Sequence, residues 1–247
     1  MTRYFDVGYL FQVVGHSMSI VNARIYNLGD NDFEAKYSPL GWLSKTQTND
    51  IPKRVYNSRG QSPDYEKNRE KVVSKAKGNL RRKIKRFKLD RFWTLTFAEN
   101  LEDVKEADKT FSNFMKRIHR RFPAFKYICT REFLERGAVH YHVAVNMYIP
   151  KQLLDGLWGK GFTWIERDQV GRNRLYRYLS KYMTKYCNDE RLKGFHLYLC
   201  SQGLNILHFD MCFDSQDAFL NYLSDTYGNL TEKFIKFYED TQLLIVI

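Results

Sequence analysis

The stretch from Gly137 to Val145 reads GAVHYHVAV and is typical of a β-strand inside a folded domain. Successive side chains of a strand point to opposite faces of the sheet. His140 and His142 therefore share one face with small alanines, and valines together with Tyr141 occupy the other. The valine face is the natural core side. Two imidazoles one pleat apart can bind a single metal ion.

A turn before this strand brings a carboxylate into reach of the histidines. We expect Glu135 to Gly137 to form a three-residue hairpin loop, with Gly137 in the left-handed conformation. Glu132 then lies directly opposite His140 on the preceding strand. A register shifted by one residue would send Glu132 to the other face. In the predicted register, one carboxylate and two imidazoles converge on one face.

Composition limits the class of protein. The 247 residues carry 40 Lys and Arg against 28 Asp and Glu, a formal charge of +12. Apolar residues make up 43% and aromatic residues 16%, which excludes a disordered chain and a collagen-like fibre. No apolar run approaches the ~18 residues of a membrane span. The four cysteines have no C-x-x-C spacing, which favours reduced thiols. We expect a cytoplasmic protein without membrane contact that binds a polyanion.

Most of the excess charge lies in one segment. From Lys67 to Arg91 there are twelve basic and two acidic residues, which carry +10 of the net +12. We expect residues 63–91 to form a basic helix that contacts DNA phosphates. The alternative is a charged helix face that only meets solvent. The expected contacts are Lys77, Arg81, Arg82, Lys83, Lys85 and Arg86.

A second helix is predicted from Arg174 to Tyr186, which reads RLYRYLSKYMTKY. Tyr178 and Tyr182 lie one turn apart, and each has a lysine three residues later, Lys181 and Lys185. An apolar stripe on this helix is centred on its leucines, Tyr182 and the terminal tyrosine. Tyr178 lies at the border of this stripe. A phenol has a pKa of about 10 and attacks poorly at neutral pH unless a cation favours its phenolate. The alternative is an aromatic stripe that is simply core.

The remaining pattern predicts an α+β fold. Phe92 to Phe97 reads FWTLTF and is typical of a strand, and Leu101 to Phe122 has helical spacing of apolar residues. Residues 127–132 favour a strand that pairs with the histidine strand. Residues 1–62 give no indication of a role, and residues 206–247 are expected to form a helical and strand extension.

Together these motifs resemble the HUH endonuclease superfamily, in particular rolling-circle replication initiators (Rep proteins) of plasmids and small single-stranded DNA phages. The strand from Phe92 to Phe97 is similar to the first family motif, and His140-Tyr141-His142 to the histidine–hydrophobic–histidine motif. Tyr178-x-x-Lys181-Tyr182-x-x-Lys185 resembles the third motif in its two-tyrosine form. The resemblance covers about residues 65–205, with the nuclease core at 92–205.

The resemblance implies an HUH/Rep-type, ferredoxin-like fold: a central antiparallel sheet flanked by helices, with the tyrosine helix across a metal site. It further implies that His140, His142 and Glu132 hold Mg²⁺ or Mn²⁺. The ion would polarise the scissile phosphate of a single-stranded DNA origin.

The implied chemistry is attack by Tyr178 or Tyr182, which leaves a 5′-phosphotyrosine link and a free 3′-hydroxyl before the strands are rejoined. Tyr178 is favoured as the first nucleophile by its border position. Lys181 and Lys185 would stabilise phosphate or phenolate charge. Implied partners are the helicase and polymerase of a bacterial host cell.

Other interpretations of the same sequence remain open at this point. A non-catalytic single-stranded nucleic-acid-binding protein would explain the charge but leave the histidines and Glu132 without a role. A two-tyrosine HUH transposase would use the same chemistry on different DNA ends. A metal-dependent hydrolase that uses water would form no covalent adduct.

Overall fold

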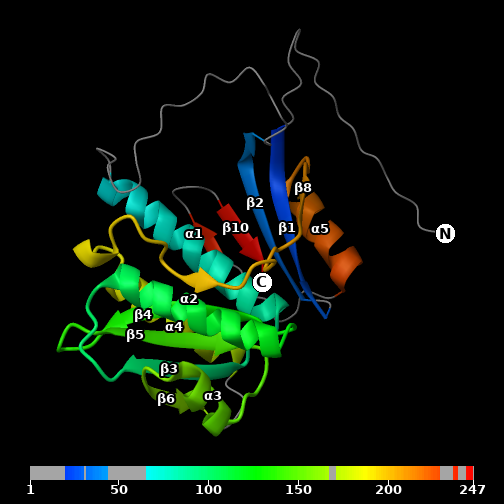
Figure 1. Ribbon diagram of the computed structural model, residues 1–247. Helices are drawn as coiled ribbons and strands as arrows, with labels where there is room; N and C mark the ends of the chain where they lie inside the picture. Colours follow the sequence, from blue (N-terminus) through cyan, green and yellow to red (C-terminus); the bar gives the residue numbers. More distant parts are fainter. Residues whose placement is uncertain are drawn as a thin grey trace, which may run out of the picture. The chain divides into compact units, whose positions relative to one another are not determined.

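The computed structural model describes residues 20–30, 32–43, 65–166, 171–228, 236–238 and 243–246. The chain divides into two compact units, one of residues 1–54 and 206–247 and one of residues 55–205 (Figure 1). Within the described residues, no helix is both long and apolar enough to cross a membrane.

An antiparallel sheet forms the centre of the 55–205 unit, with the strand order β6-β3-β5-β4-β7. The histidine strand is β5, so its predicted central position is confirmed. Together with the helices, this sheet confirms the α+β class. The strands are β3 (Arg91–Phe97), β4 (Tyr127–Phe133), β5 (Val139–Val145), β6 (Gly161–Ile165) and β7 (Leu199–Cys200).

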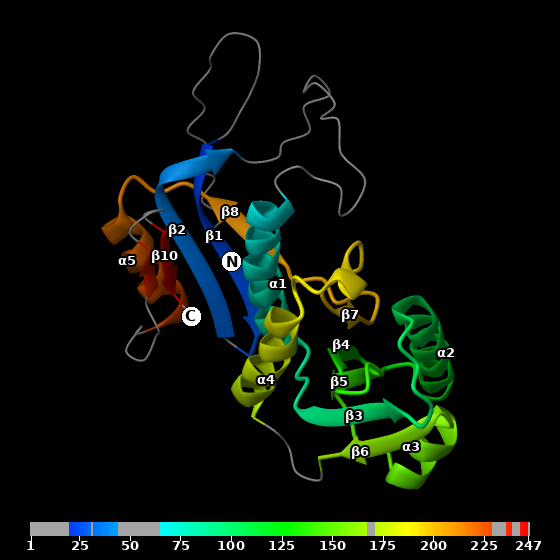
Figure 2. The same cartoon turned by 90° about the vertical axis from the view of Figure 1, so that its left-hand side faces the viewer.

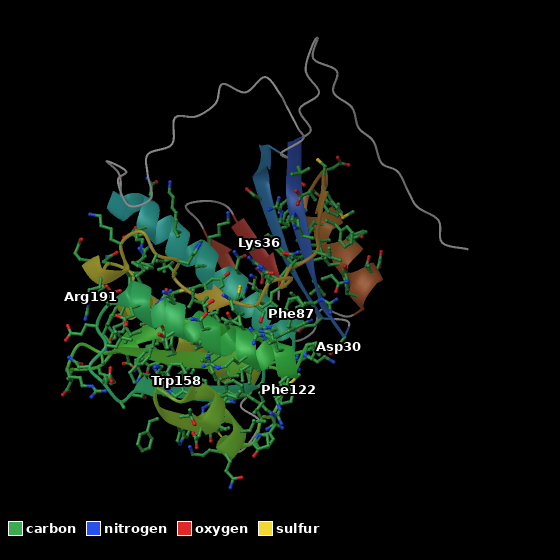
Figure 3. The ribbon with its side chains drawn as sticks, viewed as in Figure 1. Asp30, Lys36, Phe87, Phe122, Trp158 and Arg191 are labelled. Atoms are coloured by element: carbon green, nitrogen blue, oxygen red, sulfur yellow. The ribbon has the colours of Figure 1, made fainter. Side chains whose placement is uncertain are left out.

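Helices α2 (Val104–Arg121) and α3 (Lys151–Trp158) cover the valine face of this sheet (Figure 2). The carboxylate of Asp103 accepts the Glu106 N–H and caps the start of α2. Trp158, labelled in Figure 3, packs against Phe97 with ring centroids 5.1 Å apart. The valine face is therefore the main core, as its sequence predicts. The side chains of α2 that are buried here are Val104, Ala107, Phe111, Phe114, Met115 and Ile118.

The opposite face, which carries the histidines, packs against α1 (Tyr65–Arg86) and α4 (Arg172–Lys185) (Figure 2). Leu80 and Ile84 of α1 share one apolar cluster with Leu175 and Leu179 of α4. The basic helix is thus also a packing helix that supports the tyrosine helix. The sheet residues in this cluster are Phe92, Ile128 and Ala144.

The basic segment does not stay helical to its end. The Leu89 N–H donates to the Ile84 carbonyl at 3.1 Å, and the Lys88 N–H donates to the Lys85 carbonyl at 3.3 Å. Lys88 has a φ of 52°, in the left-handed region. These features form a Schellman motif, which ends α1 at Arg86 and leaves residues 87–90 as the turn into β3.

The other unit is built around a second sheet, with the order β8-β1-β2-β10-β9. Phe219 and Leu223 of α5 (Gln216–Tyr227) pack on the buried side chains of β1 and β2. Arg24 on β1 forms an ion pair with Asp210 on β8, with Nε and Oδ1 2.5 Å apart. Strands from both ends of the sequence therefore make one sheet, which the sequence pattern did not predict. The strands are β1 (Ile20–Gly29), β2 (Asp32–Leu43), β8 (His208–Met211), β9 (Lys236–Tyr238) and β10 (Leu243–Val246).

Candidate active site

The hairpin between β4 and β5 sets the register of the site. Gly137 has a φ of 90°, and its N–H donates to the Leu134 carbonyl at 2.8 Å. A Cβ at this glycine would lie 2.7 Å from Cδ of Glu102, whose exposed side chain can move aside, so it is the positive φ that favours glycine here. Glu132 pairs directly with His140 across the two strands. The predicted loop and register are confirmed.

The carboxylate and the two imidazoles lie together on one face of the sheet. Oε2 of Glu132 is 2.7 Å from Nε2 of His142, and the rings of His140 and His142 have centroids 4.8 Å apart. Nδ1 of His140 lies 3.3 Å from Oγ1 of Thr96, on the neighbouring strand β3. These contacts come from three adjacent strands, so the rigid centre of the sheet positions the group.

Both imidazoles are held in the neutral form. Burial lowers the pKa of His140 to about 4, with a further lowering from His142 and an opposing effect from Glu132. Burial likewise lowers the pKa of His142 to about 4. Neutral imidazole is the form that binds metal ions.

The same residues meet several requirements of a cation site. Within the described ranges, no group of three or more His, Cys, Asp or Glu side chains is already arranged around a common metal position. Nε2 of His140 is nevertheless buried and has no hydrogen-bond partner in the described part of the chain. Nε2 of His142 and Oε2 of Glu132 are in contact at 2.7 Å, and together with His140 these are the residues that would hold a cation.

The tyrosine helix α4 lies against the histidine pair. The Tyr182 ring stacks on His142, with centroids 4.1 Å apart and planes inclined by 23°. The Tyr178 ring meets His142 edge-on at 5.3 Å. The Tyr182 hydroxyl donates to the Tyr178 oxygen at 2.9 Å. Both predicted tyrosines are therefore brought to the predicted histidines.

The two phenols have different environments. Tyr178 is 37% exposed, whereas Tyr182 is 8% exposed. Desolvation, and then the hydrogen bond with Tyr178, raise the pKa of Tyr182 well above its usual range. The Tyr178 oxygen accepts a hydrogen bond from the Tyr182 hydroxyl. This asymmetry makes Tyr178 the more accessible of the two phenols.

The two predicted lysines lie beside this group at different distances. Nζ of Lys185 is 3.6 Å from Oε1 of Glu132 and also lies over the ring of Tyr186. Nζ of Lys181 is 5.8 Å from the centroid of the Tyr182 ring. Lys185 therefore balances the Glu132 carboxylate, and Lys181 stays near a phenol.

The predicted DNA contacts of α1 differ in accessibility. Arg86 is exposed, and Lys77, Arg81, Lys83 and Lys85 are half-buried. Arg82 is only 3% exposed and its Nη2 donates to Oδ1 of Asn79. In this conformation a phosphate does not reach the Arg82 guanidinium. Exposed cations of α1 outside the predicted set are Lys71 and Lys75.

A buried polar network on the valine face was missed by the sequence analysis. The Tyr141 hydroxyl donates to Oδ1 of Asp108 at 2.9 Å, and Nε of Arg131 donates to the same oxygen at 2.8 Å. Tyr141 lies between the two histidines in sequence, and Arg131 precedes Glu132. The network therefore fixes the strand segments that carry the site. Nothing local in the sequence links Asp108 to Arg131, because the pairing depends on the packing of α2 on the sheet.

Comparison with known proteins gives one result. Residues 90–187 match a family model described as a replication-associated protein. The matched range contains β3, the histidine strand and the tyrosine helix, and covers less than half of the 247 residues. The match supports a replication-initiator family and a role in replication initiation, and it suggests endonuclease activity. Searches of curated proteins and of solved structures returned no significant match.

Proposed function

We propose that the protein is an HUH-type replication initiator of the two-tyrosine form. In this proposal it nicks single-stranded origin DNA, remains covalently joined to the 5′ side, and later rejoins strands in rolling-circle replication. The observation that carries the proposal is the stack of Tyr182 on His142, with Tyr178 hydrogen-bonded beside it and Glu132 in contact with the same imidazole.

The first chemical step is a transfer of the DNA phosphoryl group to a tyrosine. The Tyr178 oxygen attacks the scissile phosphorus, a tyrosine O–P bond forms, and the bond from phosphorus to the 3′ oxygen breaks. The hydroxyl proton of Tyr178 passes to water, and the departing 3′ oxygen takes a proton from water to become a hydroxyl. The Tyr182 hydroxyl already donates to the attacking oxygen and would stabilise it as charge develops. A host polymerase and helicase would then extend the free 3′ end.

A divalent cation is part of the proposal. His140, His142 and Glu132 would hold it, and their neutral imidazoles and single carboxylate suit Mn²⁺ or Mg²⁺. Once bound, the ion would polarise the non-bridging oxygens of the phosphate. Lys185, 3.6 Å from Glu132, would limit the excess negative charge of the site before DNA arrives.

The second tyrosine serves the joining step. The two phenol oxygens are 2.9 Å apart, so a strand held on Tyr178 stays within reach of Tyr182. Tyr182 would cleave the next copy while the first strand is still joined to Tyr178. The 3′ hydroxyl released by that cleavage would attack the phosphorus held on Tyr178, so that a phosphodiester forms and the bond from phosphorus to the Tyr178 oxygen breaks.

A covalent-capture assay tests the nicking activity. The full chain is incubated with Mn²⁺ and a labelled pool of single-stranded oligonucleotides, and SDS-stable protein–DNA adducts are counted and sequenced. We expect adducts with a preferred cleavage sequence, and mass spectrometry of the linked peptide should place the nucleotide on Tyr178. A Tyr178→Phe, Tyr182→Phe double variant should form none. Adducts from the double variant, or none from the parent chain with any sequence, would reject the proposal.

A non-catalytic single-stranded nucleic-acid-binding protein is the second candidate. It is favoured by two exposed aromatic side chains near the site, Phe162 and Trp164, which are 80% and 50% exposed. This candidate predicts tight binding to the same oligonucleotide pool without any adduct.

A further inference from the structure

The edge strand β6 presents two large aromatic side chains to solvent. Phe162 is 80% exposed and Trp164 is 50% exposed, while Thr163 between them is buried. Alternation along the strand places both rings on the same face. Exposed aromatic rings side by side are costly to leave in water and are characteristic of binding surfaces.

The two rings continue the rows of side chains that contain the candidate metal ligands. Phe162 pairs with Thr96, which pairs with His140, and Trp164 pairs with Thr94, which pairs with His142. Side chains that pair in this way across adjacent strands share a face. Phe162 and Trp164 therefore lie on the histidine face of the sheet, one β3 side chain away from the site.

An aromatic connection leads from this edge to the tyrosine helix. The Trp164 ring meets Phe92 edge-on with centroids 6.2 Å apart, and Phe92 meets Tyr178 edge-on at 5.1 Å. Phe92 also stacks on His142 at 5.8 Å. A ligand that covers Trp164 is thus separated by one ring, that of Phe92, from the residue proposed to attack DNA.

A pocket lies in front of the two rings and has a cationic border. Arg136 holds its guanidinium there by donating from Nη2 to the Phe97 carbonyl at 2.6 Å. The pocket is lined by Thr94, Thr96, Phe97, Ala98, Arg136, Phe162, Thr163 and Trp164. Flat apolar rings beside a cation suit a ligand that has flat apolar faces and negative charge. Single-stranded DNA has both.

We propose that Phe162 and Trp164 form a stacking platform for bases that flank the scissile phosphate of single-stranded DNA, with Arg136 beside the DNA backbone. This inference rests on the proposed function for the position of the cleaved phosphate. The platform would hold the DNA strand across the sheet while its scissile phosphate lies at Tyr178.

Binding to single-stranded oligonucleotides without added metal tests the platform, since no cleavage then intervenes. Base stacking on one aromatic ring corresponds to about 5- to 150-fold in affinity. We therefore expect Phe162→Ala and Trp164→Ala each to weaken binding about tenfold or more, and Trp164→Phe to recover most of the loss. Phe209→Ala, which removes a 57% exposed ring in the other unit, is the matched control and should leave affinity unchanged.

Abasic oligonucleotides separate stacking from contact with the backbone. Where the platform bases are replaced by abasic sites, the parent chain should bind as weakly as Trp164→Ala does, and the substitution should cause no further loss. If Trp164→Ala lost as much affinity for abasic DNA as for normal DNA, the proposal would be overturned. The proposal would also be overturned if the substitutions left DNA affinity unchanged but altered the oligomeric state, because this face would then be a protein interface.

The outcomes of the two proposals are distinguishable. Base-dependent binding through Phe162 and Trp164 with no covalent adduct would retain the platform and reject nicking. Adducts on Tyr178 whose yield and sequence preference are unaffected by either substitution, with unchanged affinity, would retain nicking and reject the platform.

Discussion

Glu132 is in contact with two different partners at the candidate site, His142 Nε2 at 2.7 Å and Lys185 Nζ at 3.6 Å. Its place was predicted from the sequence because a short hairpin with Gly137 allows few registers. The unequal exposure of Tyr178 and Tyr182 was also predicted, from helical periodicity alone. The burial of Arg82 was not, because a run of cations does not reveal which side of a helix packs against its neighbours.

Removal of the Glu132 charge should weaken cation binding. In Glu132→Gln, the site keeps its shape but loses its carboxylate, so we expect Mn²⁺ affinity to fall by about 10- to 100-fold. Electron paramagnetic resonance of free Mn²⁺ measures this without any turnover. Glu135→Gln, in the exposed loop of the same hairpin, is the control and should bind as the parent does. Equal Mn²⁺ affinity of parent and Glu132→Gln would remove Glu132 from the ligand set.

The tyrosines should differ in the first cleavage. Because Tyr178 is exposed and Tyr182 is buried with a raised pKa, Tyr178→Phe should slow the first adduct by several orders of magnitude. Tyr182→Phe should have a smaller effect on that step and a large one on rejoining. Quenched-flow measurement of adduct formation checks both variants. Adduct formation by Tyr178→Phe at the parent rate would reverse the assignment.

Helices and strands that follow from a local sequence pattern could be predicted, whereas the elements with which they pair or pack often could not. The alternation along β5 and the apolar spacing of α2 gave both elements and their buried sides, since these periodicities are short-range. The pairing of β1 with β8, and of β2 with β10, joins segments from opposite ends of the sequence. No local pattern encodes such a pairing. The packing of α1 on α4 was missed for the same reason.

The β4–β5 hairpin depends on its glycine. Gly137→Ala places a Cβ on a residue with a φ of 90°, which strains the backbone, so it should destabilise the fold by about 1–3 kcal/mol. Gly156→Ala is the matched control, because it lies inside α3 with open space around it and should stabilise by about 0.5–1 kcal/mol. Urea unfolding followed by circular dichroism compares the two. A Gly137→Ala chain as stable as the parent would show that the turn adapts.

At the scale of the whole molecule, the main features are the location of the excess positive charge and the way the two units divide the sequence. The segment from Lys67 to Arg91 carries +10 of the net +12, but the structure uses part of α1 for packing. The exposed cations of α1 are the ones most accessible for direct contact with a polyanion. Composition alone indicated a polyanion as the expected partner class, and could not show which charges face outward.

Salt dependence of DNA binding should therefore follow the exposed cations. Changing Lys71, Lys75 and Arg86 to Gln should make the slope of log K against log salt less steep by about 2. Each phosphate contact to a single strand contributes ~0.7 to that slope. The same change at Lys105, Lys109 and Lys116 is the control, because these exposed residues lie on α2, which covers the opposite face of the sheet. Fluorescence anisotropy across a salt series gives both slopes. Equal slopes for the parent and the α1 variant would exclude this helix from the DNA interface.

The Arg24–Asp210 pair should make stability depend on acid. The hydrogen-bonded Arg24 guanidinium lowers the pKa of Asp210 below its usual value of 3.8. A depressed folded pKa gives stability that is present above the unfolded value and is lost as pH falls through the folded pKa. Asp210→Asn should therefore lower the Tm at pH 7 and have little effect near pH 2, which scanning calorimetry at both values checks. A Tm difference that is the same at both pH values would contradict the assignment.

The interleaved sheet also affects how the chain folds as it leaves the ribosome. β2 ends at Leu43, and its partner β10 begins only at Leu243, after the entire 55–205 unit has been synthesised. That unit can begin to fold vectorially, while β2 presents an open strand edge until β10 has been synthesised. Stalled or prematurely terminated nascent chains would then expose this edge and become substrates for chaperones, even though their tyrosine and histidine residues were already in place.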